Sequence, residues 1–235
     1  MENIGLMAYQ GTIRRAVLSA FADTNLLPLD TAAFIEISFT TREELDIVAA
    51  TKPILDALKG SVYADDAAVR TLTVRIDPNT TPLRRGPEGE IVISIGEEQS
   101  IPGEQPHKTL AFLPVSLKIN TSIRQDEPPH SMKGEPVDNN SEMEQLADKI
   151  RNTLDYEQIT PLGGDLMVSV KIRARERTLD IDNILKLYLG ALLGICFSNL
   201  SQLKFVHVTF MDVEVFDAEE GLYLTFAPYN PRDWE

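Results

Sequence analysis

The chain has 235 residues, of which 43% are hydrophobic and 25% are charged, so it is long enough for one large domain or two small ones. Its formal net charge of −14 excludes general affinity for bulk DNA, because neutralised phosphates supply most non-specific binding. Nucleic-acid binding would need a local basic patch. No apolar run reaches the roughly 18 residues of a membrane span, and we expect no signal peptide. With Cys196 alone, no intrachain disulfide can form, and we expect a cytoplasmic location.

Taken in chain order, the hydrophobic pattern predicts two series of elements that share the order helix, strand, helix, strand and closing hairpin. The first series is predicted at about 9–25, 34–39, 44–60, 69–76 and 90–95. A segment rich in Gly, Pro and Glu, 96–108, then reads as a linker. An additional strand is expected within 109–123. The second series follows at 141–154, 168–173, 178–194, 203–210 and 222–226.

The two series align without a gap when Asp46 is placed on Asp180. The same alignment matches Lys52 with Lys186, and Gly60 with Gly194. Strand-like segments before and after each helix match in the same register. The sequence therefore predicts an α/β (α+β) fold made of two tandem repeats. The first covers 1–95 and lacks the opening strand, and the second covers 109–235.

The helix at 178–194 combines an apolar surface with a narrow polar stripe. Asp182, Lys186 and Gly190 are spaced four residues apart, and a stripe of this kind on a buried helix usually faces a cleft. Asp180 precedes the helix, where the helix dipole favours a carboxylate. Two carboxylates at such a turn suit a hard cation such as Mg²⁺. The alternative is that one aspartate caps the helix and Lys186 is solvated.

A local basic patch precedes this helix. Lys171, Arg173, Arg175 and Arg177 occupy alternate positions, so on an extended strand all four would face one side and lead towards Asp180. Such a row is a candidate track for DNA phosphates beside a metal site. The alternative is the polar face of an edge strand, where basic side chains discourage aggregation. The three histidines lack the spacing of metal ligands, and we assign them no role.

Two stretches together resemble the RusA family of Holliday-junction resolvases. The family pattern is D-x-D-N-x-x-K, then a helix ending near L-D-A-L-G, then a D-D pair and a strand. The second repeat supplies "DIDNILK" at 180–186, and the first supplies "KPILDALKGSVYADDAAVRTLTV" at 52–74. The resemblance covers most of both repeats apart from the linker.

The resemblance implies a dimeric α/β endonuclease that cuts branched DNA in recombination and repair with Mg²⁺ (or Mn²⁺). In this chain the two repeats would form an intramolecular pseudo-dimer, and the protein would be monomeric. In the family, both Asp of D-x-D and the second Asp of D-D form the site, and the Lys assists. Carried over, the catalytic candidates are Asp180, Asp182, Lys186, Asp46, Asp66 and Lys52, and the metal-ligand candidates are Asp180, Asp182, Asp66 and Asp65.

Each repeat lacks acids that the other keeps. Val48 stands where the first repeat should have its second acid, and Leu200 stands at the third acidic position of the second repeat. The remaining acids could form one composite site between the repeats or two weakened sites. Alternatively, both sites have decayed, and the chain is a scaffold that binds DNA or protein without catalysis.

Overall fold

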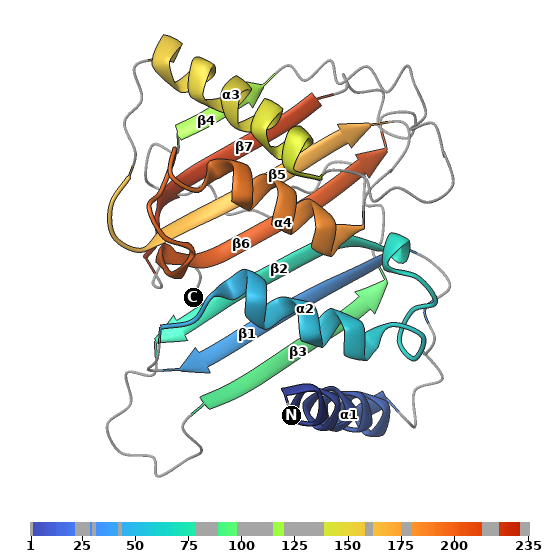
Figure 1. Cartoon of the computed structure of the whole chain (residues 1–235). Coiled ribbons are helices and arrows are strands. Elements are labelled where there is room, and N and C mark those ends of the chain that lie inside the picture. The colour runs from blue at the N-terminus through green and yellow to red at the C-terminus, as the bar shows by residue number, and fades with distance from the viewer. Residues whose placement is uncertain are drawn as a thin grey trace.

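The structure is a computed structural model that describes residues 2–21, 29, 32–41, 44–78, 89–97, 115–119, 139–157, 162–174, 180–212 and 221–230. Seven strands form one mixed sheet in the order β3-β1-β2-β6-β5-β7-β4 (Figure 1). The expected α/β class is therefore confirmed, and both halves of the chain contribute to the same sheet.

The elements of the two halves follow the same order. The first half contains α1 (Glu2–Phe21), β1 (Ala33–Thr41), α2 (Ile47–Leu58), the short 3₁₀ helix η1 (Asp66–Ala68), β2 (Val69–Pro78) and β3 (Gly89–Glu97). The second contains β4 (Val115–Ile119), α3 (Asn139–Glu157), β5 (Leu166–Ala174), α4 (Ile181–Leu192), η2 (Leu200–Gln202), β6 (Leu203–Asp212) and β7 (Gly221–Pro228). The pairing also matches: β1 is parallel to β2 and antiparallel to β3, and β5 is parallel to β6 and antiparallel to β7.

The prediction that each half closes with a hairpin is wrong. β3 pairs with β1 and β7 pairs with β5, so neither strand pairs with the strand that precedes it in the chain. The reason is that β2 and β6 use their free edges to pair with each other. Each closing strand is therefore left with the outer edge of β1 or β5.

The two halves correspond with one small offset. Helices α2 and α4 begin at equivalent positions of the repeat alignment, and so do strands β2 and β6, as the sequence predicts. The strand registers differ slightly, because Ile35 lies opposite Leu72 whereas Val168 lies opposite Val206. Strands β1 and β5 are therefore displaced by a single position from the repeat alignment, and the connection from β5 to α4 holds the extra residue.

Both central helices end in the same turn. Gly60 and Gly194 have positive φ angles of 75° and 79°, which glycine adopts without the steric cost of a Cβ. Each glycine N–H donates 2.7 Å to a carbonyl three residues on, that of Tyr63 or Phe197. This turn directs the chain from the end of each helix towards η1 or η2.

The two halves join through β2 and β6. In this antiparallel pair Thr73 lies opposite His207, its counterpart in the repeat alignment, so the pairing is centred on equivalent residues. His207 is only 5% exposed. Its Nδ1 lies 2.9 Å from Thr73 Oγ1 and its Nε2 lies 2.7 Å from Thr209 Oγ1. A histidine without an expected role thus links the strands at the junction.

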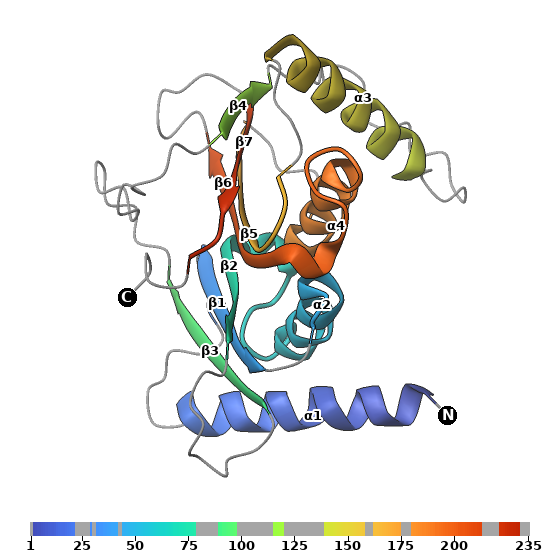
Figure 2. The ribbon, with the colours of Figure 1, turned by 90° about the vertical axis from the view of Figure 1, so that its left-hand side faces the viewer.

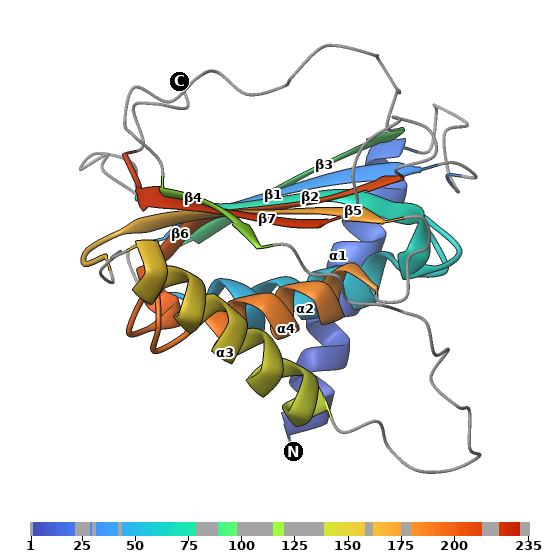
Figure 3. The ribbon, with the colours of Figure 1, turned by 90° about the horizontal axis from the view of Figure 1, so that it is seen from above.

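Helices α2 and α4 lie side by side on one face of the sheet, across the β2–β6 junction, and contact each other (Figures 1 and 3). Helix α3 packs against α4, while α1 contacts α2 and lies at the β3 end of the sheet (Figure 2). No described helix has the length and apolar character that crossing a membrane requires.

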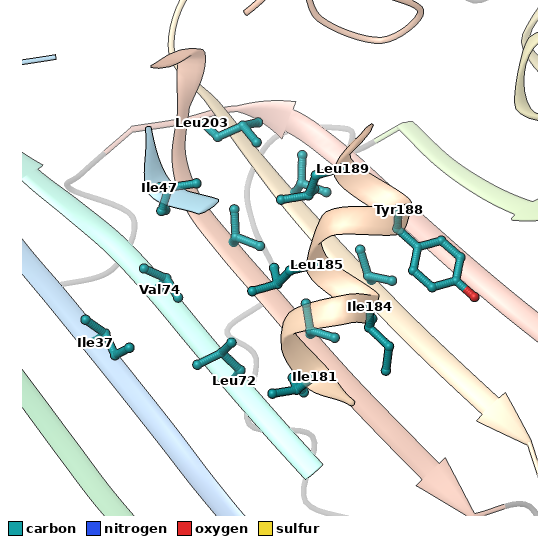
Figure 4. Close-up of a cluster of buried hydrophobic side chains, with 14 of the residues drawn as sticks. Ile37, Ile47, Leu72, Val74, Ile181, Ile184, Leu185, Tyr188, Leu189 and Leu203 are labelled. Carbon is teal, nitrogen blue, oxygen red and sulfur yellow. The ribbon is translucent and has the colours of Figure 1, made fainter. Parts of the chain in front are cut away.

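The hydrophobic core is continuous between the halves. Ile37 and Val74 from the first half belong to the same buried cluster as Leu185 and Leu189 of α4 (Figure 4). Alternation on the strands explains this, because every second residue of β1 from Ala33 to Phe39 is buried under the helices. Cys196 is fully buried in this core, and burial raises the pKa of its thiol to about 12.

We predict that the two halves unfold together. Leu185→Ala should lower the free energy of unfolding by about 2–5 kcal/mol, because it leaves a cavity in the shared core. Val92→Ala, at a side chain that is 49% exposed, is the control and should change it by less than about 0.5 kcal/mol. Denaturant unfolding followed by circular dichroism and by hydrogen exchange checks this. Two separate transitions would contradict a common core.

Candidate metal centre

Three carboxylates from the two halves meet beside the junction. Asp180 immediately precedes α4, Asp182 lies in its first turn, and Asp66 begins η1, which contacts α4. One carboxylate oxygen from each residue lies within 4.8 Å of the others. The side chains of Asp66 and Asp182 are only 14% and 17% exposed. The acids that the sequence assigns to different repeats therefore form one composite cluster.

Local capping places Asp66 in this cluster. The neighbouring Asp65 is exposed and accepts a hydrogen bond of 2.9 Å from Ala67 N, so it caps η1. Asp66, the second acid of the D-D pair, begins η1, and this short helix contacts α4. Asp65 was expected to be a metal ligand, but the structure does not place it among the three clustered acids.

Two lysines of the first half hold the clustered carboxylates. Lys52 Nζ on α2 donates 2.7 Å to Asp182 Oδ2, which links the two halves. Lys59 Nζ donates 2.6 Å to Asp66 Oδ2. Each hydrogen bond is the main reason that the pKa of its lysine is raised. Because both lysines are largely exposed, these ion pairs contribute little to stability and mainly orient the carboxylates.

Asp180 differs from its counterpart in the first half. Asp46 Oδ1 accepts hydrogen bonds from Val48 N at 2.9 Å and Ala49 N at 3.0 Å, which caps α2. Asp180 occupies the same position before α4 but makes no capping bond with its side chain. A capping side chain is typically worth about 0.5–2 kcal/mol, and α4 lacks this contribution.

The surroundings of Asp180 disfavour its negative charge. Burial raises the pKa of its carboxyl, and the charges of Asp66, Asp65 and Asp182 raise it further, while Lys59 opposes them. Two like unit charges 4 Å apart repel by about 4 kcal/mol at an effective dielectric constant of 20. A cation bound between the three carboxylates would turn this repulsion into attraction.

The cluster fits a hard divalent cation. Mg²⁺ prefers oxygen ligands at about 2.0–2.1 Å, so oxygens on opposite sides of the ion lie about 4.2 Å apart. One carboxylate oxygen from each aspartate lies within 4.8 Å of the others, so the three side chains would have to move closer together to bind one ion. Among the residues that the structure describes, this is the one group of at least three His, Cys, Asp or Glu side chains close enough to share an ion. Its all-carboxylate composition favours Mg²⁺ or Mn²⁺ over softer metals.

Two other candidate residues have different surroundings. Asp46 is exposed and caps α2, outside the cluster. Lys186 is exposed on α4, and no described contact joins it to the three acids. The polar stripe does not face a cleft along its length, because a Cβ added to Gly190 would lie 2.7 Å from Met143 Sδ. The missing side chain at Gly190 lets α3 pack closely on α4.

The described part of the basic patch lies on the other side of the sheet. Val170 packs in the core beneath the helices, so Lys171 and Arg173 project from the opposite face, as strand alternation requires. Arg173 lies 4.6 Å from the ring centre of Tyr223 and donates 3.2 Å to its hydroxyl. Burial and the charge of Arg173 lower the pKa of Lys171. Arg175 and Arg177 fall outside the described residues.

Two residues near the cluster were missed in the sequence. One is Lys59, and the other is Tyr63, a buried residue whose hydroxyl donates 3.0 Å to Leu55 O. Burial and then the charge of Asp66 raise the pKa of Tyr63. The repeat alignment could have identified both residues. Their counterparts in the second repeat are Leu193 and Phe197, and that repeat also lacks an acid equivalent to Asp66.

We predict opposite effects for alanine at the two equivalent aspartates in the metal-free protein. Asp46→Ala should destabilise it by about 0.5–2 kcal/mol near pH 7, because α2 loses its cap. Asp180→Ala should raise the melting temperature there, because a residue with a raised folded-state pKa is ionised at a cost to the folded state above that pKa.

The pH dependence provides the control. Below the ordinary aspartate pKa of 3.8 both folded and unfolded Asp180 are protonated, so the gain from Asp180→Ala should disappear in acid. Thermal unfolding across this pH range in the presence of a chelator measures it. Destabilisation by Asp180→Ala equal to that by Asp46→Ala would contradict the unfavourable environment of Asp180.

Comparisons of the chain with protein-family models, with curated proteins and with solved structures find no match.

Proposed function

We propose that the chain is a divalent-metal-dependent endonuclease of the RusA type that acts on branched DNA, with Mg²⁺ or Mn²⁺ as cofactor. The proposal depends on one observation. The acids selected by the resemblance, Asp180 and Asp182 from one repeat and Asp66 from the other, converge within 4.8 Å.

In this proposal the three aspartates hold the metal. Lys52 and Lys59 keep Asp182 and Asp66 turned towards it through their hydrogen bonds. A bound divalent ion would polarise a phosphoryl oxygen and lower the pKa of a water molecule. Hydrolysis then joins the water oxygen to phosphorus and breaks one P–O ester bond. The leaving oxygen takes up a proton, so the products are a phosphate monoester and a hydroxyl.

The proposal also predicts where DNA would bind on the protein surface. The net charge of −14 restricts DNA to a local positive surface. Lys171 and Arg173 lie near the carboxyl end of β5, whereas Asp180 follows that end on the helix side. We therefore expect a DNA strand to cross the sheet at the carboxyl end of β5. Its phosphates would lie near the two basic side chains on one face of the sheet and near the acids on the other face.

A tandem duplication accounts for the shared pattern of the two halves. The gapless repeat alignment, the matching strand pairing and the β2–β6 contact centred on Thr73 and His207 all support an intramolecular pseudo-dimer. In such a chain, the dimer interface of an ancestral single-repeat protein becomes the middle of one sheet. The two halves can then diverge independently, as the unequal acids indicate.

We predict metal-dependent cleavage of a synthetic four-way DNA junction. Asp182→Asn should slow cleavage by more than the roughly 10–100-fold that loss of a second-shell partner typically costs, because it weakens a direct ligand. Asp148→Asn is the matched control, since Asp148 lies on α3, and its side chain is 70% exposed and pairs with Arg151. Cleavage that Asp182→Asn leaves unchanged would refute the catalytic role.

A second candidate function is binding without catalysis. The observation that favours it is that Val48 and Leu200 stand at two positions where the family pattern has acids. A chain with this function would bind the junction at low salt with equal affinity with or without metal, and would leave every strand intact. Metal-dependent cutting in the same assay separates the two functions.

We also predict a monomer in solution. If the fusion replaces a homodimer, light scattering should give a mass near 26.2 kDa over a wide concentration range. Twice that mass would argue against the pseudo-dimer, because the β2 edge that would pair with a second chain is already occupied by β6.

A further inference from the structure

The approximate symmetry of the chain creates two equivalent positions for a cluster of acids. At the first, η1 contacts α4, and at the second, η2 contacts α2. The first position holds Asp66, Asp180 and Asp182. The counterparts at the second are Leu200, Asp46 and Val48. Two of the three carboxylates are thus replaced by aliphatic side chains.

Asp46, the remaining acid of the second position, has a different structural role. Asp46 accepts two backbone N–H groups and caps α2, whereas Asp180 leaves its helix uncapped. In η2, Asn199 accepts from Ser201 N at 2.9 Å, and Gln202 Oε1 accepts from Asn199 N at 3.0 Å. This reciprocal cap uses neutral side chains, whereas the corresponding cap of η1 is made by Asp65.

Two side chains near the first cluster have no equivalent in the second half, whereas Lys52 has a lysine, Lys186, as its counterpart. Lys59, which holds Asp66, has Leu193 as its counterpart, and the buried Tyr63 has Phe197. One chance substitution would remove one acid and leave its partners in place. The coordinated loss of two acids, a lysine and a tyrosine indicates that only one position still needs them.

From this asymmetry we infer that only one of the two equivalent positions holds a metal ion, and that the chain cuts one DNA strand per encounter. The inference rests on the proposed function and defines its product. Separating a four-way junction into two duplexes requires cuts in two strands of the same polarity, and one centre in one orientation reaches one of them. The product of one encounter is a nicked junction, and a second cut needs a new encounter.

A plasmid that extrudes a cruciform distinguishes the two outcomes. The full chain is bound to the plasmid first, and Mg²⁺ is then added together with excess competitor junction, so that each complex acts once. One cut relaxes the supercoil to a nicked circle, which is the expected product. Linear plasmid as the main product of this single encounter would overturn the inference.

Restoring the lost acids gives the complementary test. Val48→Asp combined with Leu200→Asp rebuilds the second set at two partly exposed positions, while the first cluster stays intact. Continued nicking by this variant proves that it is folded. The inference predicts that linear plasmid then forms in one encounter. A variant that nicks normally but makes no linear product would overturn it.

Titration with Mn²⁺ alone, followed by electron paramagnetic resonance, separates this inference from the proposed function. Binding in the natural chain should be lost in Asp182→Asn and should gain a second equivalent centre in the rebuilt variant. If Mn²⁺ binds as expected but no DNA is cut, the proposed nuclease function is refuted and the single metal centre is still supported. Two equivalent centres in the natural chain, or none, would refute the single centre.

Discussion

The antiparallel pairing of β2 with β6 is the contact on which the rest of the structure depends. It joins two similar halves into one sheet, with Thr73 opposite its counterpart His207. This pairing sets α2 beside α4 and brings η1 of the first half to the start of α4. Without it, Asp66 would be separated from Asp180 and Asp182, and neither half alone would contain three neighbouring acids. The candidate centre is therefore a product of the junction between the halves.

The charges at the junction disfavour the metal-free folded state near Asp180. α4 lacks the side-chain cap that α2 has, and Asp180 stays close to like charges that raise its pKa. The two lysines neutralise part of this charge and leave Asp180 without a hydrogen-bonded cation among the described residues. The opposite position has lost the corresponding acids and kept the cap. Under the proposed function this difference is expected, because only the first position would need to bind a cation.

The sequence predicted the elements and the acids better than their spatial relations. The D-x-D motif and the resemblance to the RusA family pattern selected Asp180, Asp182 and Asp66 as candidates, because short motifs are local signals that a sequence retains. Hydrophobic alternation could not reveal that β3 pairs with β1, since edge choice depends on which partner strand is available. It also could not place Lys171 on the face opposite α4, and it gave no sign that His207 links the halves. Such features arise from tertiary packing, which overrides local pattern.

The most direct test of the composite centre is a crystal structure of the natural chain soaked in Mn²⁺, with an anomalous difference map. We expect a peak bound by carboxylate oxygens of Asp66, Asp180 and Asp182, with Mn²⁺ taking the place of Mg²⁺. No peak is expected beside Asp46 and Leu200. An empty map at the three aspartates, or equal peaks at both positions, would contradict a single centre built from the two halves.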